Sequence, residues 1–180
     1  MTKLPRTIRL DASDALIYAP AAEPGEWAIA GGFMFADDTE QTLTAKRRQA
    51  FRGGFLGLAS FGWSTLVEVA EATPADHAAA RAALATHLEQ DHGAPSRADA
   101  EAAAAEELAF AASLCDHPPG TILALTRTLE ADGVRESFRT LHLRAREHRD
   151  FGALPVFNIV TVEGEDAPER PDLTRLGDRP

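Results

Sequence analysis

Cys115 and His117 lie two residues apart, which places a thiol near an imidazole. Such a pair can act as a nucleophile and its general base, so both residues are candidates for catalysis. However, they follow the carboxyl end of a predicted helix, where the helix dipole and Asp116 would raise the pKa of a thiol. Cys115 also continues the apolar face of that helix. The favoured interpretation is a buried, unreactive thiol, with His117 capping the carboxyl end of the helix.

His87, Asp91 and His92 could ligate a metal, because residues four apart share one face of a helix. His87 and Asp91 have this spacing, and His92 is one position further along. The H-E-x-x-H pattern of zinc metalloproteases is absent, since Leu-Glu-Gln-Asp follows His87. A solvated helix face is therefore favoured, and we expect neither a metal nor a cofactor.

Residues 57–62 (GLASFG) carry two glycines five positions apart, as in a phosphate-binding loop. The Lys-Ser/Thr pair that should follow is replaced by Trp63-Ser64. The segment is also predicted to run from a helix into a strand, which would present helix carbonyls, not amides, to an anion. These features argue against a phosphate site.

A basic segment follows in an otherwise acidic chain. Its members are Arg135, Arg139, His142, Arg144, Arg146, His148 and Arg149. The first four could bind an anionic ligand, since arginine pairs well with carboxylates and phosphates. Acidic residues are interspersed among them, and a run of charges usually forms a solvated face, which is the favoured interpretation.

A group of aromatic residues is a further candidate, because aromatics could line a pocket for an apolar ligand. The group comprises Trp27, Phe33, Phe35, Phe51, Phe55, Phe61 and Trp63. Large aromatics more commonly form the core of a domain, and we favour that interpretation.

The chain has 180 residues, a formal net charge of −10 and one cysteine. This length favours a single domain. The acidic balance argues against nucleic acid as a partner, because it repels phosphate. The first residues lack the apolar region of a signal peptide, and no apolar run approaches the roughly 20 residues that span a bilayer. We therefore expect a cytoplasmic protein that does not contact a membrane.

Alternation and helical spacing predict the elements that must position these residues. Strands are expected at 7–11, 14–19, 26–35, 64–71, 121–130, 134–143 and 154–162. Helices are expected from about 39 to 55, from Thr73 to 93 and from Ser96 to 115, the last two starting at capping residues. The central segment, residues 51–70, is expected to pass from a helix into a central strand.

A hairpin is expected around Asp132-Gly133, a strong signal for a two-residue turn. With these two residues as the loop, Glu130 would face Arg135. Arg127 and Glu136 interrupt the apolar face of the hairpin, and we expect them to pair diagonally.

These elements predict one α+β domain over residues 1–163. It contains a mostly antiparallel sheet of about six or seven strands covered by three helices, with a ferredoxin-like fold as one arrangement that fits. Residues 164–180 are charged and proline-containing, and we expect a loosely ordered tail.

Four segments spread over most of the chain resemble a family of short bacterial proteins known as a domain of unknown function. They are residues 4–11 (LPRTIRLD), 23–27 (EPGEW), 54–69 (GFLGLASFGWSTLVEV) and 111–121 (AASLCDHPPGT). The resemblance implies an accessory role near the maturation of metalloenzymes, including molybdenum-dependent dehydrogenases. It assigns no role to any residue.

The sequence does not determine the function, and we weigh two expectations. The first is a cytoplasmic accessory or protein-interaction protein that is not an enzyme. It would act through a surface made by the central segment and the two alanine-rich helices at 73–115, and a homo-oligomer is a variant of it. The second is a small-molecule-binding domain or enzyme that holds an anionic ligand with the basic segment and His117.

Overall fold

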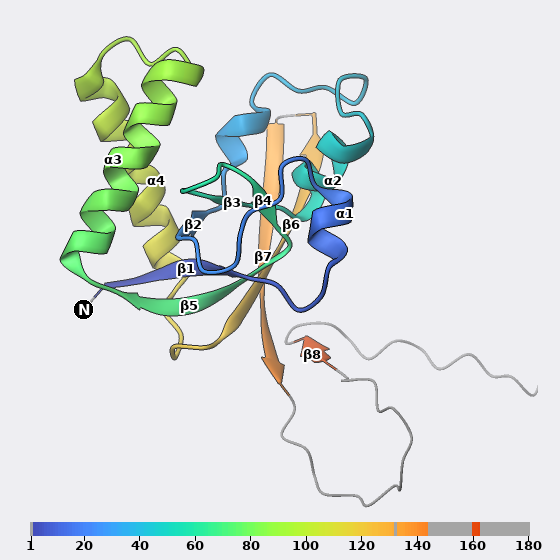
Figure 1. Ribbon diagram of the computed structural model, residues 1–180. Coiled ribbons are helices and arrows are strands. Elements are labelled where there is room, and N and C mark those ends of the chain that lie inside the picture. The colour runs from blue at the N-terminus through green and yellow to red at the C-terminus, as the bar shows by residue number, and fades with distance from the viewer. Residues whose placement is uncertain (1, 132, 144–159, 163–180) are drawn as a thin grey trace, which may run out of the picture.

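The computed structural model describes residues 2–131, 133–143 and 160–162, which form an α+β fold of two antiparallel sheets and flanking helices (Figure 1). The large sheet has the spatial order β1 (Thr2–Ile8), β5 (Leu66–Ala72), β6 (Ile122–Glu130), β7 (Gly133–Leu143), β8 (Val160–Val162). The small sheet has the order β2 (Ala28–Ile29), β3 (Phe55–Gly57), β4 (Trp63–Ser64). The helices of the described residues are α1 (Ser13–Ile17), the 3-10 helix η1 (Gly32–Phe35), α2 (Ala45–Gly53), α3 (Pro74–Asp91) and α4 (Arg97–Ser113). The predicted α+β class is confirmed, with the strands divided between two sheets.

Helices α3 and α4 form a hairpin that occupies a single connection, between β5 and β6. In Figure 1 they stand side by side, with the small sheet between them and the pair α1 and α2. The strands of the large sheet are neighbours in the order in which they occur along the chain, so the topology differs from the ferredoxin-like βαββαβ arrangement.

The starts of α3 and α4 are those that their capping residues predict. The Thr73 hydroxyl accepts from the Asp76 amide at 3.1 Å, and the Asp76 carboxylate accepts from the Thr73 amide at 2.9 Å. This reciprocal pair satisfies two amides that the first turn of a helix leaves without partners. Ser96 accepts from the amide of Asp99 in the same way at the start of α4.

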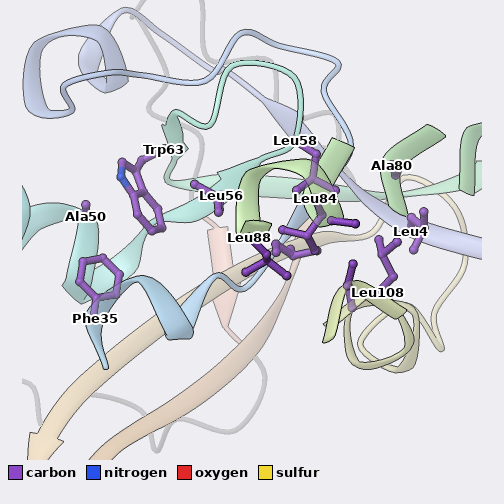
Figure 2. Close-up of a cluster of buried hydrophobic side chains, with 14 of the residues drawn as sticks. Leu4, Phe35, Ala50, Leu56, Leu58, Trp63, Ala80, Leu84, Leu88 and Leu108 are labelled. Atoms are coloured by element: carbon purple, nitrogen blue, oxygen red, sulfur yellow. The ribbon is translucent and has the colours of Figure 1, made fainter. Parts of the chain in front are cut away.

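The main core continues from the helix pair to the small sheet. Figure 2 shows Leu4, Leu84 and Leu108 meeting between α3, α4 and β1, and Phe35 packing against Trp63 beside Ala50 of α2. The rings of Phe35 and Trp63 are 5.1 Å apart between centroids. A second cluster, which includes Phe55 and Cys115, lies against the large sheet.

Four predicted elements near the amino terminus have a wrong type or wrong bounds. The first strand is Thr2–Ile8, not 7–11. Residues 14–19 are not a strand, because 13–17 form α1. Asp14 ties this helix to the residue before β5 by accepting from the Thr65 amide (3.0 Å) and hydroxyl (2.6 Å). Residues 26–35 contain only the short strand β2. Gly31 then adopts a left-handed φ of 73° and starts η1, at a position where a Cβ would lie 2.7 Å from that of Leu56. The next helix begins at Ala45, later than the predicted 39.

The predicted hairpin of β6 and β7 is confirmed, but its register differs by two residues. Glu130 pairs with Gly133, so the tight connection lies between them and Arg135 faces Thr128. A shift of two residues keeps every side chain on its predicted face. Arg127 and Glu136 are directly opposite each other, not diagonal.

The central segment does not pass directly from a helix into a long strand. After α2 it forms β3, turns back as β4 and only then enters β5. Gly54, at the end of α2, lies so close to Ala50 and Trp63 that a Cβ would be 2.8 Å from an atom of each. Of the predicted strand 154–162, residues 160–162 form β8, and the remainder and the expected tail lie outside the described residues.

Candidate functional site

A groove of about 880 Å³ runs along one side of α3. One wall is α3 itself, and the other is made by residues 24–27 and by the β3–β4 connection, which Figure 1 shows reaching toward α3. The residues that give the groove its apolar character are Trp27, Leu58, Phe61, Ala79, Ala80 and Ala83. The volume lies within the range of about 300–1,000 Å³ that is usual for ligand pockets.

The alanine content of α3 creates this groove. Leu84 and Leu88 bury one side of the helix against α4 and β1, while the side that faces the β3–β4 connection carries alanines. Methyl side chains do not reach the opposite wall. Part of an apolar surface therefore remains open, where larger residues would have closed it.

Glu26 holds the opposite wall in place. Its carboxylate accepts from the amides of Ala59 (3.0 Å), Ser60 (2.8 Å) and Glu23 (2.6 Å). Burial opposes ionisation of Glu26, but the hydrogen bonds from Ser60, Glu23 and Ala59 together outweigh it and lower the pKa of the carboxyl. The glycine-containing stretch 57–62 is thus a connection between two strands, and its amides bind a carboxylate of the same chain.

Three polar residues meet at the end of the groove, where α3 ends. Nδ1 of His87 lies 2.9 Å from a carboxylate oxygen of Asp91, and its Nε2 lies 3.2 Å from Nε2 of His92. His92 is the C-terminal capping residue of α3, and Gly93 follows with a left-handed φ of 66°. The turn places the ring of His92 above that of His87.

Two phenylalanines fix these imidazoles. The ring of Phe61 stacks on that of His87 at 3.8 Å and 16°, and the ring of Phe33 meets His92 edge-on at 5.3 Å. The His87 side chain is only 14% exposed, whereas that of Asp91 is 60% exposed. The expected solvated helix face is therefore correct for Asp91 but not for His87.

The hydrogen bonds define the chemistry that this cluster can perform. The carboxylate of Asp91, 2.9 Å from Nδ1 of His87, favours the neutral tautomer with its proton on Nδ1 and a lone pair on Nε2. Desolvation and the neighbouring His87 lower the pKa of His92, while Asp91 acts in the opposite direction. The cluster thus presents imidazole nitrogens that can accept a hydrogen bond or ligate a cation.

Cys115 lies buried in the second core cluster. Burial raises the pKa of its thiol to about 11, against the opposing effect of Lys3. A thiol of this pKa is protonated near neutral pH and is a poor nucleophile. His117, the other catalytic candidate, accepts a 2.6 Å hydrogen bond from Nζ of Lys3 through its main-chain oxygen.

The anion-binding candidates lie on β7 and beyond it. Arg135 is exposed and pairs with Glu130 at 2.9 Å, and Arg139 lies on the same exposed face of the strand. His142 pairs with Thr161 in the ladder, but its side chain is not among those described. Arg144 and the rest of the basic segment lie outside the described residues.

The aromatic group divides between the core and the groove. Phe35, Phe51, Phe55 and Trp63 are buried in the core, as expected of large aromatics, whereas Trp27 and Phe61 line the groove. The sequence showed no signal that separates these two sets. Phe61 adopts a φ of 51°, unusual for an aromatic residue, and this turns its ring toward His87.

The described residues contain no group of three or more His, Cys, Asp or Glu side chains arranged to hold a metal. The same described residues contain no helix long and apolar enough to cross a membrane.

The structure is thus that of an α+β protein with an apolar groove that ends in a cluster of Asp91, His87 and His92. The model of a family of unknown function, DUF6505, matches residues 1–154, and the chain belongs to this family. No curated protein and no solved structure matches the chain.

Proposed function

We propose that the protein is an accessory protein that binds an apolar segment of another protein in the groove along α3. The groove carries this proposal. It lies between part of the central segment and one of the two alanine-rich helices, the elements from which the sequence led us to expect an interaction surface.

The length of the groove favours a polypeptide as its occupant. Its lining residues on α3 run from Ala79 to Asp91, twelve steps of the helix. At 1.5 Å per residue this is about 18 Å. Five or six extended residues, or about three turns of helix, have this length. A compact small molecule would fill only part of it.

The polar end of the groove would give the segment a direction. Gln90, Asp91 and His87 lie at one end, and most of the remaining lining residues are apolar. Each Å² of apolar surface buried on binding would contribute about 25 cal/mol of favourable free energy. The net charge of −10 favours a partner with basic groups beside the apolar segment, since complementary charge speeds encounter.

The resemblance to short bacterial proteins suggests what kind of partner this is. That resemblance implies an accessory role in the maturation of metalloenzymes, including molybdenum-dependent dehydrogenases. The partner that we propose is therefore an immature enzyme subunit in the cytoplasm.

The test fills the groove without disturbing the core. Ala83→Leu adds bulk at a half-buried groove position, and Ala103→Leu makes the same change on the exposed face of α4. We expect affinity purification from the native cells to recover a protein with wild type and Ala103→Leu, but not with Ala83→Leu. The complex formed again from purified components should be weakened at least tenfold by Ala83→Leu alone.

Two outcomes would overturn the proposal. One is that no recovered protein depends on Ala83. The other is a dimer of the chain itself that dissociates on Ala83→Leu, which would make the occupant a second copy.

A further inference from the structure

We propose that Nε2 of His87 and Nε2 of His92 bind one divalent transition-metal ion, zinc, with Asp91 as the carboxylate that orients His87. This site would lie at the end of the groove along α3. The inference goes beyond partner binding and does not depend on it.

The separation of the two nitrogens is that of two ligands of one ion. Zinc binds imidazole nitrogen at about 2.0–2.1 Å with tetrahedral angles, which puts two such nitrogens about 3.3 Å apart. Nε2 of His87 and Nε2 of His92 are 3.2 Å apart. The separation of the two nitrogens therefore matches that of two ligands of one tetrahedral ion.

Asp91 supplies the hydrogen-bond acceptor that a metal-ligating histidine usually has beside its other ring nitrogen. Such histidines almost always donate the second ring N–H to a carboxylate, a carbonyl or water, which fixes the tautomer and makes the ligand more basic. Nδ1 of His87 lies 2.9 Å from a carboxylate oxygen of Asp91. This pairing favours the proton on Nδ1 and the lone pair on Nε2, the nitrogen that faces His92.

The rings are already held in the binding geometry. Phe61 stacks on His87, and Phe33 packs its ring edge against His92. His92 retains access to solvent, so an ion can reach the pair.

The coordination would be open. Within the described residues no third His, Cys, Asp or Glu completes the set, so water or a group in the groove would fill the remaining positions. His87 also lines the groove, which places those positions next to any bound ligand.

The experiment is a calorimetric titration of the full chain with zinc chloride alone. We expect one zinc ion per chain, with affinity reduced more than tenfold in His87→Ala and in His92→Ala. Asp91→Asn should reduce it about tenfold or more, the usual cost of losing a carboxylate behind a ligating histidine. His77→Ala, which removes another imidazole from α3, is the matched control and should bind zinc like wild type.

A thermal unfolding series separates binding from folding. Each variant should unfold cooperatively without zinc, since none of the three cluster residues belongs to the buried core. Zinc should raise the Tm of wild type and His77→Ala but not that of His87→Ala or His92→Ala. The proposal fails if millimolar zinc gives no binding, or if the double variant His87→Ala/His92→Ala binds as well as wild type.

Discussion

Arg127 connects the two sheets, and its replacement should strongly destabilise the fold. Its side chain is completely buried, on the same face of β6 as Leu123 and Leu125. Nε donates to Glu136 at 2.6 Å. The two terminal nitrogens donate to main-chain oxygens at the end of α2 and next to β2.

These acceptors are main-chain oxygens at the end of α2 and the oxygen of Ala30, next to β2. Nη1 lies 2.9 Å from the oxygen of Gly54, 3.2 Å from that of Phe51 and 3.4 Å from that of Ala50, and Nη2 bonds the oxygen of Ala30. Carbonyls in the last turn of a helix lack intrahelical donors, and Arg127 supplies donors to those of Phe51 and Gly54. The oxygen of Ala50 also accepts from the Gly54 amide at 2.9 Å. The guanidinium also lies over the ring of Phe35, 5.5 Å from its centroid.

Arg127→Met keeps a long side chain but removes every one of these donors. Breaking a buried ion pair from one side costs about 3–5 kcal/mol, because the remaining charge has no partner. The total free energy of unfolding of a native domain is only about 5–15 kcal/mol. We therefore expect urea unfolding of Arg127→Met to show a midpoint lowered by a large fraction of its wild-type value, with an unchanged slope.

A matched control exists on the same hairpin. Arg135 pairs with Glu130 across β6 and β7, but its side chain is 69% exposed. Arg135→Met should cost only about 0–1 kcal/mol, the usual value for a surface ion pair. If Arg127→Met is no more destabilising than Arg135→Met, the buried hydrogen bonds do not hold the sheets together and the reasoning is wrong.

Two further predictions concern the groove wall and the end of α2. Because hydrogen bonds lower the pKa of Glu26, its stabilising effect is present above the ordinary glutamate value and is lost as the pH falls through the folded-state pKa. Glu26→Gln should thus cost about 1.5–3 kcal/mol at pH 7, from lost hydrogen bonds to a charged group, and progressively less below about pH 4. Urea unfolding of wild type and Glu26→Gln at pH 7 and below about pH 4 measures this difference in stability. Glu23→Gln is the control, because the Glu23 side chain is 74% exposed. A loss of stability in Glu26→Gln that is equal at the two pH values would contradict the prediction. Gly54→Val should leave the chain unfolded or aggregated, because its Cβ would lie 2.8 Å from the Ala50 carbonyl and the Trp63 ring. Circular dichroism and size-exclusion chromatography check this. A cooperatively folded variant with wild-type stability would show that the packing at Gly54 is not tight.

The sequence by itself determined the elements whose signals are local. Thr73 and Ser96 start α3 and α4 because a side chain and an amide three residues later suffice to cap a helix. The faces of the β6–β7 hairpin were likewise predictable, since alternation along each strand is independent of register. The class of fold follows from these elements.

Only the tertiary structure decided the elements near the amino terminus. Residues 13–17 form a helix because Asp14 meets Thr65, and η1 interrupts the apolar stretch after β2 because Gly31 packs against Leu56. Each of these contacts joins residues more than 20 positions apart. Local propensity contains no information about them.

The same distinction applies to the candidate site. The sequence placed His87, Asp91 and His92 near one another, but a spacing of five does not bring two side chains together within a continuous helix. Nε2 of His92 meets that of His87 because α3 ends at Asp91, with His92 capping it before the turn at Gly93. The groove itself exists because residues 24–27 and 58–61, distant in sequence, are brought opposite the alanines of α3. Residue types can be read from a sequence, whereas a cavity is a property of surfaces that folding brings face to face.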